Sequence, residues 1–68
     1  MTRQHFESLA EACGNLYRRF CEQRPERDAR AAFDATVAEV SAACRRFNGG
    51  FKPERFARAA RKHAGLEQ

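Results

Sequence analysis

The stretch PERDARAAFDATVAEVSAACRRF, residues 25–47, decides the fold of this 68-residue chain. Its mainly apolar stripe recurs every three or four positions, which is the spacing of an amphipathic helix that buries one face. The stripe consists of Ala29, Phe33, Thr36, Val37, Val40, Cys44 and Phe47. Pro25 is suited to a first helical position, and Asn48-Gly49-Gly50 ends the pattern. We therefore predict a helix of about six turns over residues 25–47.

A second helix is predicted over residues 3–23, where another apolar stripe recurs at helical spacing. Thr2 is placed to cap its first turn, and Gly14-Asn15 interrupts its middle, which leaves a kink or a local break open. The residue before Pro25 is biased away from helical angles, so this helix ends near Gln23. Such a short connection makes the two long helices an antiparallel hairpin.

A short third helix is predicted over residues 53–64. Phe51 and Phe56 have the spacing of a hydrophobic staple around the start of this helix. Gly65 is placed to close it, and Leu66 to fold back onto its last turn. We predict an all-α, three-helix fold that forms a single domain over residues 1–68, with the helix 25–47 central and facing both others.

Phenylalanine must supply most of the buried surface, because the chain holds six Phe, three Leu and two Val but no Trp. A fully buried Phe contributes roughly 1.5–3 kcal/mol, and Phe33 and Phe56 are predicted to anchor the core. No apolar run approaches the roughly 20 residues of a membrane span, and the N-terminus does not resemble a signal peptide. We therefore expect a soluble protein of the cytoplasm without membrane contact.

The cysteines Cys13, Cys21 and Cys44 are expected to be reduced thiols, because their number is odd and no secretory signal precedes them. A metal site that recruits His5 or His63 is the alternative, but the chain has no CxxC or HxxxH spacing. The sequence also lacks a Ser-His-Asp set and a glycine-rich phosphate loop. We expect half-buried histidines that serve packing, no metal, no cofactor and no enzymatic activity.

The net charge of +4 is concentrated near the C-terminus, where residues 49–68 carry five basic and two acidic side chains. Such a concentration on one short helix is typical of phosphate contacts, and it predicts a nucleic-acid-binding face. The residues of this face are Arg55, Arg58, Arg61 and Lys62. An ordinary solvated face is the alternative, because no polar or aromatic side chain is interleaved there to read bases and the spacing of a helix-turn-helix is absent.

A row of alanines lies on the side of the helix 25–47 opposite Phe33 and Val40. Its members are Ala31, Ala35, Ala38 and Ala42. Small residues let two helices approach closely, and a chain with so few large apolar side chains gains burial by association. We therefore predict a homodimer in which two copies of this helix pair antiparallel, which would bring Asp34 near Arg45 or Arg46 of the other copy. The alternative is that alanine is only a good helix former.

Short motifs stand at both ends of the chain: Arg3-Gln4-His5-Phe6 at the start, and Phe51 with Arg55-Phe56 and Ala59-Ala60 near the end. They resemble the Lys/Arg-x-His-Phe start and the Phe-x-x-x-Arg-Phe-x-x-Ala end of small orphan proteins of tailed bacteriophages, prophages and related mobile elements. Lys52 departs from the acidic residue common in that group. The resemblance covers the two ends only, implies the cytoplasm of a bacterial host, and brings no catalytic residues.

Taken together, these features predict a non-enzymatic protein that acts by binding a host macromolecule. Nucleic-acid binding through the basic face of the third helix is the alternative function.

Overall fold

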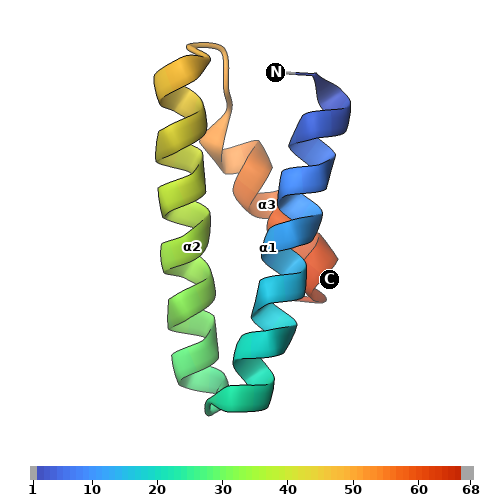
Figure 1. The fold of residues 1–68 in the computed structure, drawn as a ribbon, viewed down its shortest axis with the longest axis vertical. Helices are drawn as coiled ribbons and strands as arrows, with labels where there is room; N and C mark the ends of the chain where they lie inside the picture. The colour runs from blue at the N-terminus through green and yellow to red at the C-terminus, as the bar shows by residue number, and fades with distance from the viewer. Residues whose placement is uncertain (1, 67–68) are drawn as a thin grey trace.

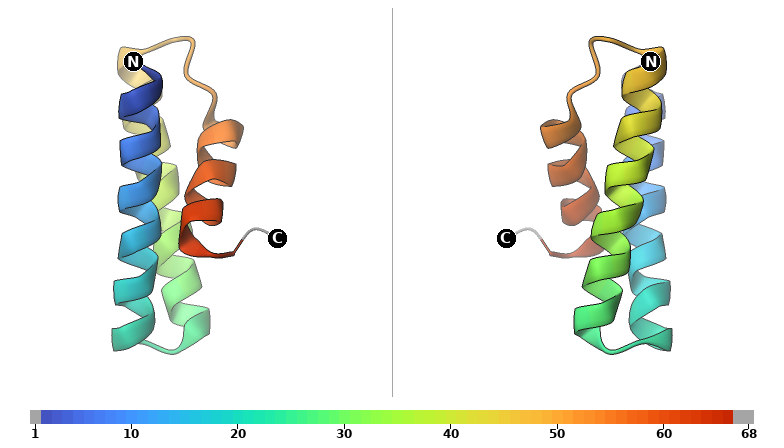
Figure 2. Two further views of the ribbon diagram at one scale, coloured as in Figure 1. Left: turned by 90° about the vertical axis from the view of Figure 1, so that its right-hand side faces the viewer. Right: turned by 90° about the vertical axis from the view of Figure 1, so that its left-hand side faces the viewer.

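The computed structural model describes residues 2–66, which form three α-helices: α1 (Arg3–Gln23), α2 (Glu26–Phe47) and α3 (Pro53–Ala64) (Figure 1). α1 and α2 form an antiparallel hairpin, and α3 lies against one face of this hairpin (Figure 2). The predicted all-α, three-helix fold is confirmed. α2 begins one residue later than predicted, because Pro25 has an extended ψ of 152° and occupies the N-cap position.

The ends of α1 and α3 are closed by the expected local hydrogen bonds. The Thr2 hydroxyl oxygen accepts a hydrogen bond from the backbone N–H of His5 at 3.2 Å. Gly65 adopts the left-handed conformation with φ of 79°, and its N–H donates to the carbonyl of Lys62 at 3.2 Å. The N–H of Leu66 donates to the carbonyl of Arg61 at 2.9 Å, which completes a Schellman motif.

Phenylalanine rings form the centre of the core. Phe33 and Phe56 are the largest fully buried side chains, with 1% and 0% of their surface exposed, so both predicted anchors are confirmed. Phe56 packs on Phe51, with ring centroids 5.6 Å apart, as the predicted staple requires. It also meets Phe6 edge-to-face at 5.5 Å, and Phe33 meets Tyr17 edge-to-face at 5.3 Å. These aromatic contacts join all three helices.

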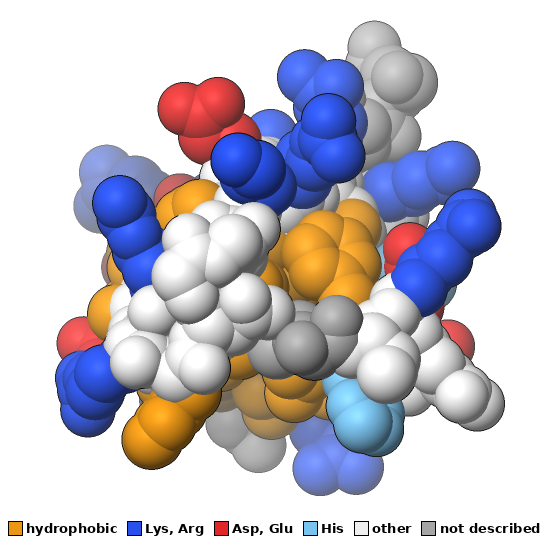
Figure 3. Space-filling view, turned by 90° about the horizontal axis from the view of Figure 1, so that it is seen from above, with side chains coloured by type: hydrophobic (Ala, Val, Ile, Leu, Met, Phe, Trp, Pro, Cys, Tyr) orange, Lys and Arg blue, Asp and Glu red, His pale blue; other side chains and the backbone are white. Residues whose placement is uncertain are grey.

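Phe47 does not belong to the core, contrary to the predicted stripe, because 87% of its surface is exposed. The buried residues of α2 are spaced by four: Ala29, Phe33, Val37 and Ser41. Each step of four residues advances by about 400°, so the buried line rotates by about 40° per step toward α3. Phe47 therefore lies on a side of α2 from which the buried line has turned away. Seen from the end where α2 finishes, hydrophobic side chains reach the surface between scattered Lys and Arg side chains (Figure 3).

α1, rather than α2, is the central helix, because α3 packs more closely against α1 than against α2. Gly14 allows α3 to pack this closely against α1. α1 continues through Gly14 without a break. The Cα of Gly14 faces the last turn of α3 so closely that an added Cβ would come within 2.7 Å of the backbone carbon of His63. The residue that interrupts the sequence pattern is therefore a close-packing position and not a kink.

Polar contacts hold the same end of α3 against α1. The guanidinium of Arg18 donates to the backbone carbonyl of His63 and, at 2.9 Å, to the side-chain oxygen of Asn15. The imidazole Nε2 of His63 lies 3.3 Å from a carboxylate oxygen of Glu7. A guanidinium at the carboxyl end of a helix also interacts favourably with the helix dipole. α3 is thus fixed to α1 at its C-terminal end, and it diverges from α2.

Candidate functional site

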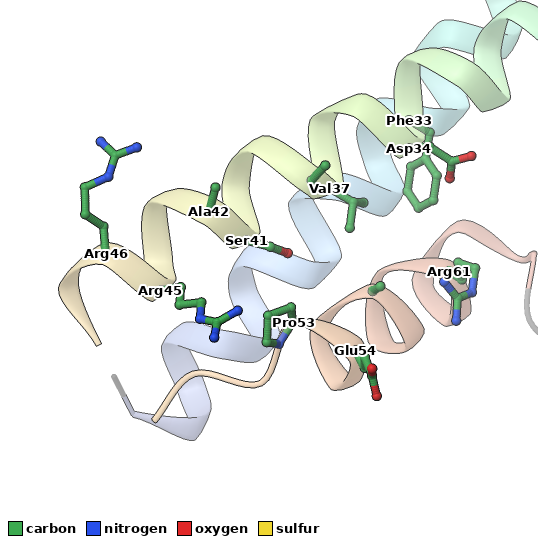
Figure 4. A pocket seen from close by; sticks show the side chains of 12 residues that line it. Phe33, Asp34, Val37, Ser41, Ala42, Arg45, Arg46, Pro53, Glu54 and Arg61 are labelled. Carbon is green, nitrogen blue, oxygen red and sulfur yellow. The ribbon is translucent and has the colours of Figure 1, made fainter. Parts of the chain in front are cut away.

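An open groove of about 770 Å³ runs between α2 and α3 (Figure 4). In Figure 4 the side chains of Phe33 and Val37 point from α2 toward α3, with Pro53 at one end of the space and Arg61 at the other. The apolar part of its lining consists of Phe33, Val37, Ala38, Ala42, Pro53 and Ala57. Phe33 and Val37 are buried beneath the groove, so its accessible apolar surface comes mainly from the small side chains of Ala38, Ala42, Pro53 and Ala57. The groove is larger than the two hollows lined by His5 and by Arg58, of about 490 and 650 Å³, that are described below.

Charged side chains of both signs stand around the groove: Arg45, Arg46 and Glu54 toward the end where α2 finishes, and Asp34 and Arg61 toward the other end (Figure 4). Arg45 reaches toward Pro53, whereas Arg46 points away from α3 (Figure 4). Within residues 2–66, neither of these two arginines takes part in an ion pair. Asp34 lies on the groove further down α2 and is paired with Arg30 at 3.3 Å. Arg45 therefore remains available to a carboxylate outside the described chain.

All four residues of the alanine row on α2 are exposed. Ala38 and Ala42 line the groove, whereas Ala31 and Ala35 lie outside it. The sequence pattern thus located one wall of the groove but not the groove itself. The missing signal was on the facing helix, where the small residue Ala57 also lines the groove. Self-association through the alanine row stays a prediction.

The predicted nucleic-acid-binding residues do not share one surface. Arg55, Arg58 and Lys62 line a second hollow, between α3 and α1, together with Glu7 and His63. Arg61 is half-buried and lies on the other side of α3, where it lines the α2–α3 groove. Three basic side chains around one hollow can meet a phosphate, and the fourth points elsewhere. Nucleic-acid binding by these residues stays a prediction.

The two histidines differ from each other. His63 is half-buried and paired with Glu7, which agrees with the packing role expected for it. His5 is exposed, so the expectation that it is half-buried is wrong. It lies on the first turn of α1 and lines a third hollow with Leu9, Ala43 and Phe47. Among residues 2–66, the structure holds no group of three or more His, Cys, Asp or Glu side chains arranged for a metal ion.

The cysteines are free thiols, as predicted, and they differ in accessibility: Cys13 is buried, Cys44 half-buried and Cys21 exposed. Burial, and secondarily the nearby thiol of Cys44, raise the pKa of Cys13 above its usual value. A raised pKa leaves less thiolate at neutral pH, and the thiolate is the reactive form.

We therefore expect iodoacetamide to alkylate Cys21 first and Cys13 at least about tenfold more slowly at pH 7.5. Peptide mass spectrometry over a time course measures the order. The same reaction in denaturant should remove the difference, because unfolding exposes both thiols. Equal rates for Cys13 and Cys21 in the native protein would contradict the placement of Cys13 in the core.

Within the part of the chain that the structure describes, no helix combines the length and the apolar character that crossing a bilayer requires. Comparison of the chain with protein-family models, with curated proteins and with solved structures found no match.

Proposed function

We propose that this chain is a non-catalytic binding protein that holds an amphipathic helix of a partner protein in the groove between α2 and α3. The observation that carries the proposal is the accessible apolar surface that Ala38, Ala42, Pro53 and Ala57 give this groove. Covering apolar surface is favourable by about 25 cal/mol per Å², and an amphipathic helix laid into an apolar groove is a recurring mode of recognition.

The dimensions of the groove suit a helix of three to four turns. Its α2 wall extends from Phe33 to Arg46, about 20 Å at 1.5 Å per residue. Ala38 and Ala42 on one wall and Ala57 on the other allow the backbone of a bound helix to approach closely. Arg45, which has no ion pair within residues 2–66, favours a partner helix with Asp or Glu at the edge that meets it.

A bacterial protein is the partner that best fits the remaining observations. Both ends of the chain resemble small proteins of bacteriophages and mobile elements, which act inside a bacterial host. The net charge of +4 favours association with an acidic partner.

Site-specific photocrosslinking tests the proposal. A small diazirine amino acid is introduced at Ala42, which lines the groove, and separately at Ala31, an exposed alanine of the same row outside the groove. On irradiation of bacterial cells, we expect position 42 to give a discrete adduct that position 31 does not give. Ala38→Glu should abolish this adduct, because a carboxylate would then lie on the apolar lining.

The adduct mass and its dependence on position decide the outcome. Equal adducts from both positions, or none from position 42, would overturn the groove as the binding site. An adduct between two copies of this chain would instead favour the antiparallel dimer through the alanine row. A gel shift with mixed-sequence duplex DNA at low salt tests the alternative function. DNA binding that is weaker in Arg58→Ala but unchanged in Ala38→Glu would favour nucleic-acid binding by the basic side of α3 over the groove proposal.

A further inference from the structure

The face of the α1–α2 hairpin opposite α3 carries no third helix in the described chain (Figure 2). Near the upper end of this hairpin lies a hollow of about 490 Å³ whose lining comes from α1, α2 and Asn48. Leu9 and Cys44 line it and are only half-buried. Phe47 stands at its edge and is the large hydrophobic residue that the fold leaves most exposed among those described.

The apolar character continues down both helices from this hollow. Leu16 follows Leu9 by two turns of α1, and Val40 precedes Phe47 by two turns of α2, so each pair shares a helix face. Leu16 and Val40 are also half-buried. The hairpin therefore presents a strip of partly covered apolar side chains on the side away from α3.

Charge distinguishes this strip from the rest of the surface. None of the residues that line the hollow is Lys, Arg, Asp or Glu, in a chain of which 32% is charged. A net charge of +4 opposes the approach of a second copy elsewhere on the molecule. When two copies meet through this strip, no Lys, Arg, Asp or Glu side chains of the hollow are placed against each other, and His5 is the titratable imidazole in its lining.

We propose that this strip is the interface with a second copy of the chain, in which the Phe47 ring of each copy enters the hollow of the other. A two-fold interface needs the same patch to carry both partners of a contact, and the hairpin carries the projecting ring beside the hollow. A dry cavity of about 150 Å³ already accommodates a benzene ring, so the hollow has room for Phe47.

The size of the hairpin face sets the largest area that such a dimer can bury. The molecule measures 35 × 19 Å in the plane of the hairpin (Figure 1). Complete overlap of two such faces covers at most about 1,300 Å² in total, near the lower end of the range of specific interfaces. The product is a four-helix arrangement of two hairpins with α3 on each outer side. The α2–α3 groove stays open in this dimer, because the groove and the hollow share no lining residue.

Sedimentation of the full chain at concentrations up to about 1 mM tests the proposal. We expect the wild type to show a reversible monomer–dimer equilibrium. Phe47→Glu, which charges the ring position, and Ala43→Glu, which charges the exposed wall of the hollow, should each weaken dimerisation at least about tenfold. Both residues are exposed in the monomer, so circular dichroism should show an unchanged helical spectrum for each variant.

Ala38→Glu is the matched control, because it places the same charge on another exposed alanine of α2 that does not line the hollow. It should dimerise like the wild type. A wild type that stays monomeric, or a Phe47→Glu variant that dimerises normally, overturns the proposal. Dissociation by Ala38→Glu with normal dimerisation of Phe47→Glu also overturns it and moves the interface to the alanine row. The dimerisation measured by sedimentation does not depend on whether the groove between α2 and α3 binds a partner helix.

Discussion

Phe33→Ala is expected to lower the free energy of unfolding by about 3–5 kcal/mol, which is most or all of the stability of a domain of this size. Phe33 is 1% exposed and meets Tyr17 edge-to-face, so its removal opens a cavity between α1 and α2 and also ends an aromatic contact. The few large apolar side chains of the chain cannot fill that space. Urea unfolding followed by circular dichroism measures the change.

Phe47→Ala is the matched control for this experiment. It removes the same side chain from the same helix, but from a position that is 87% exposed. We expect a change within about 0.5 kcal/mol when the protein is dilute enough to be monomeric. A Phe33→Ala variant that unfolds cooperatively at nearly the wild-type midpoint would contradict the described core.

Gly14→Ala is expected to destabilise the protein by about 1–3 kcal/mol, although alanine favours a helix interior over glycine by about 1 kcal/mol. The new Cβ would lie 2.7 Å from the backbone carbon of His63 and 2.9 Å from the backbone nitrogen of Ala64. Backbone atoms cannot swing aside as a flexible side chain does. The last turn of α3 must therefore move away from α1, which also strains the Arg18 contact to His63.

The test is whether Gly14→Ala makes the protein less stable or more stable than the wild type. Thermal unfolding followed by circular dichroism measures this change in stability. Gly49→Ala is the control, because a Cβ at that position meets no atom within 4 Å. We expect it to be nearly neutral. A Gly14→Ala variant more stable than the wild type would show that α3 does not approach α1 at this point.

The parts of the fold that were predictable from the sequence are those set by local interactions. The helix ends depend on residues within one turn, and so the Thr2 cap and the Gly65 motif were found correctly. Phe33 and Phe56 were identified as anchors, because a chain with so little apolar volume must bury its aromatic residues near the middle of its helices.

The errors concern the relation between helices. Periodicity assigns Phe47 to the stripe of Phe33, but the direction in which the buried line rotates depends on where α3 packs. Gly14 looks like an interruption because its partner, His63, is far away in the sequence. The groove was missed for the same reason: Ala38 and Ala57 are ordinary residues until α2 and α3 are placed side by side.

Gly14 has an evolutionary consequence for a site that it does not touch. By allowing α3 to approach α1, it sets how far α3 diverges from α2, and hence the width of the groove in which Asp34 and Arg45 lie. If the groove binds a partner helix as we propose, selection for a particular partner in related chains should act on this position as well as on the groove itself. A lineage that replaces the glycine by a larger residue should then change its partner, even with every groove residue retained.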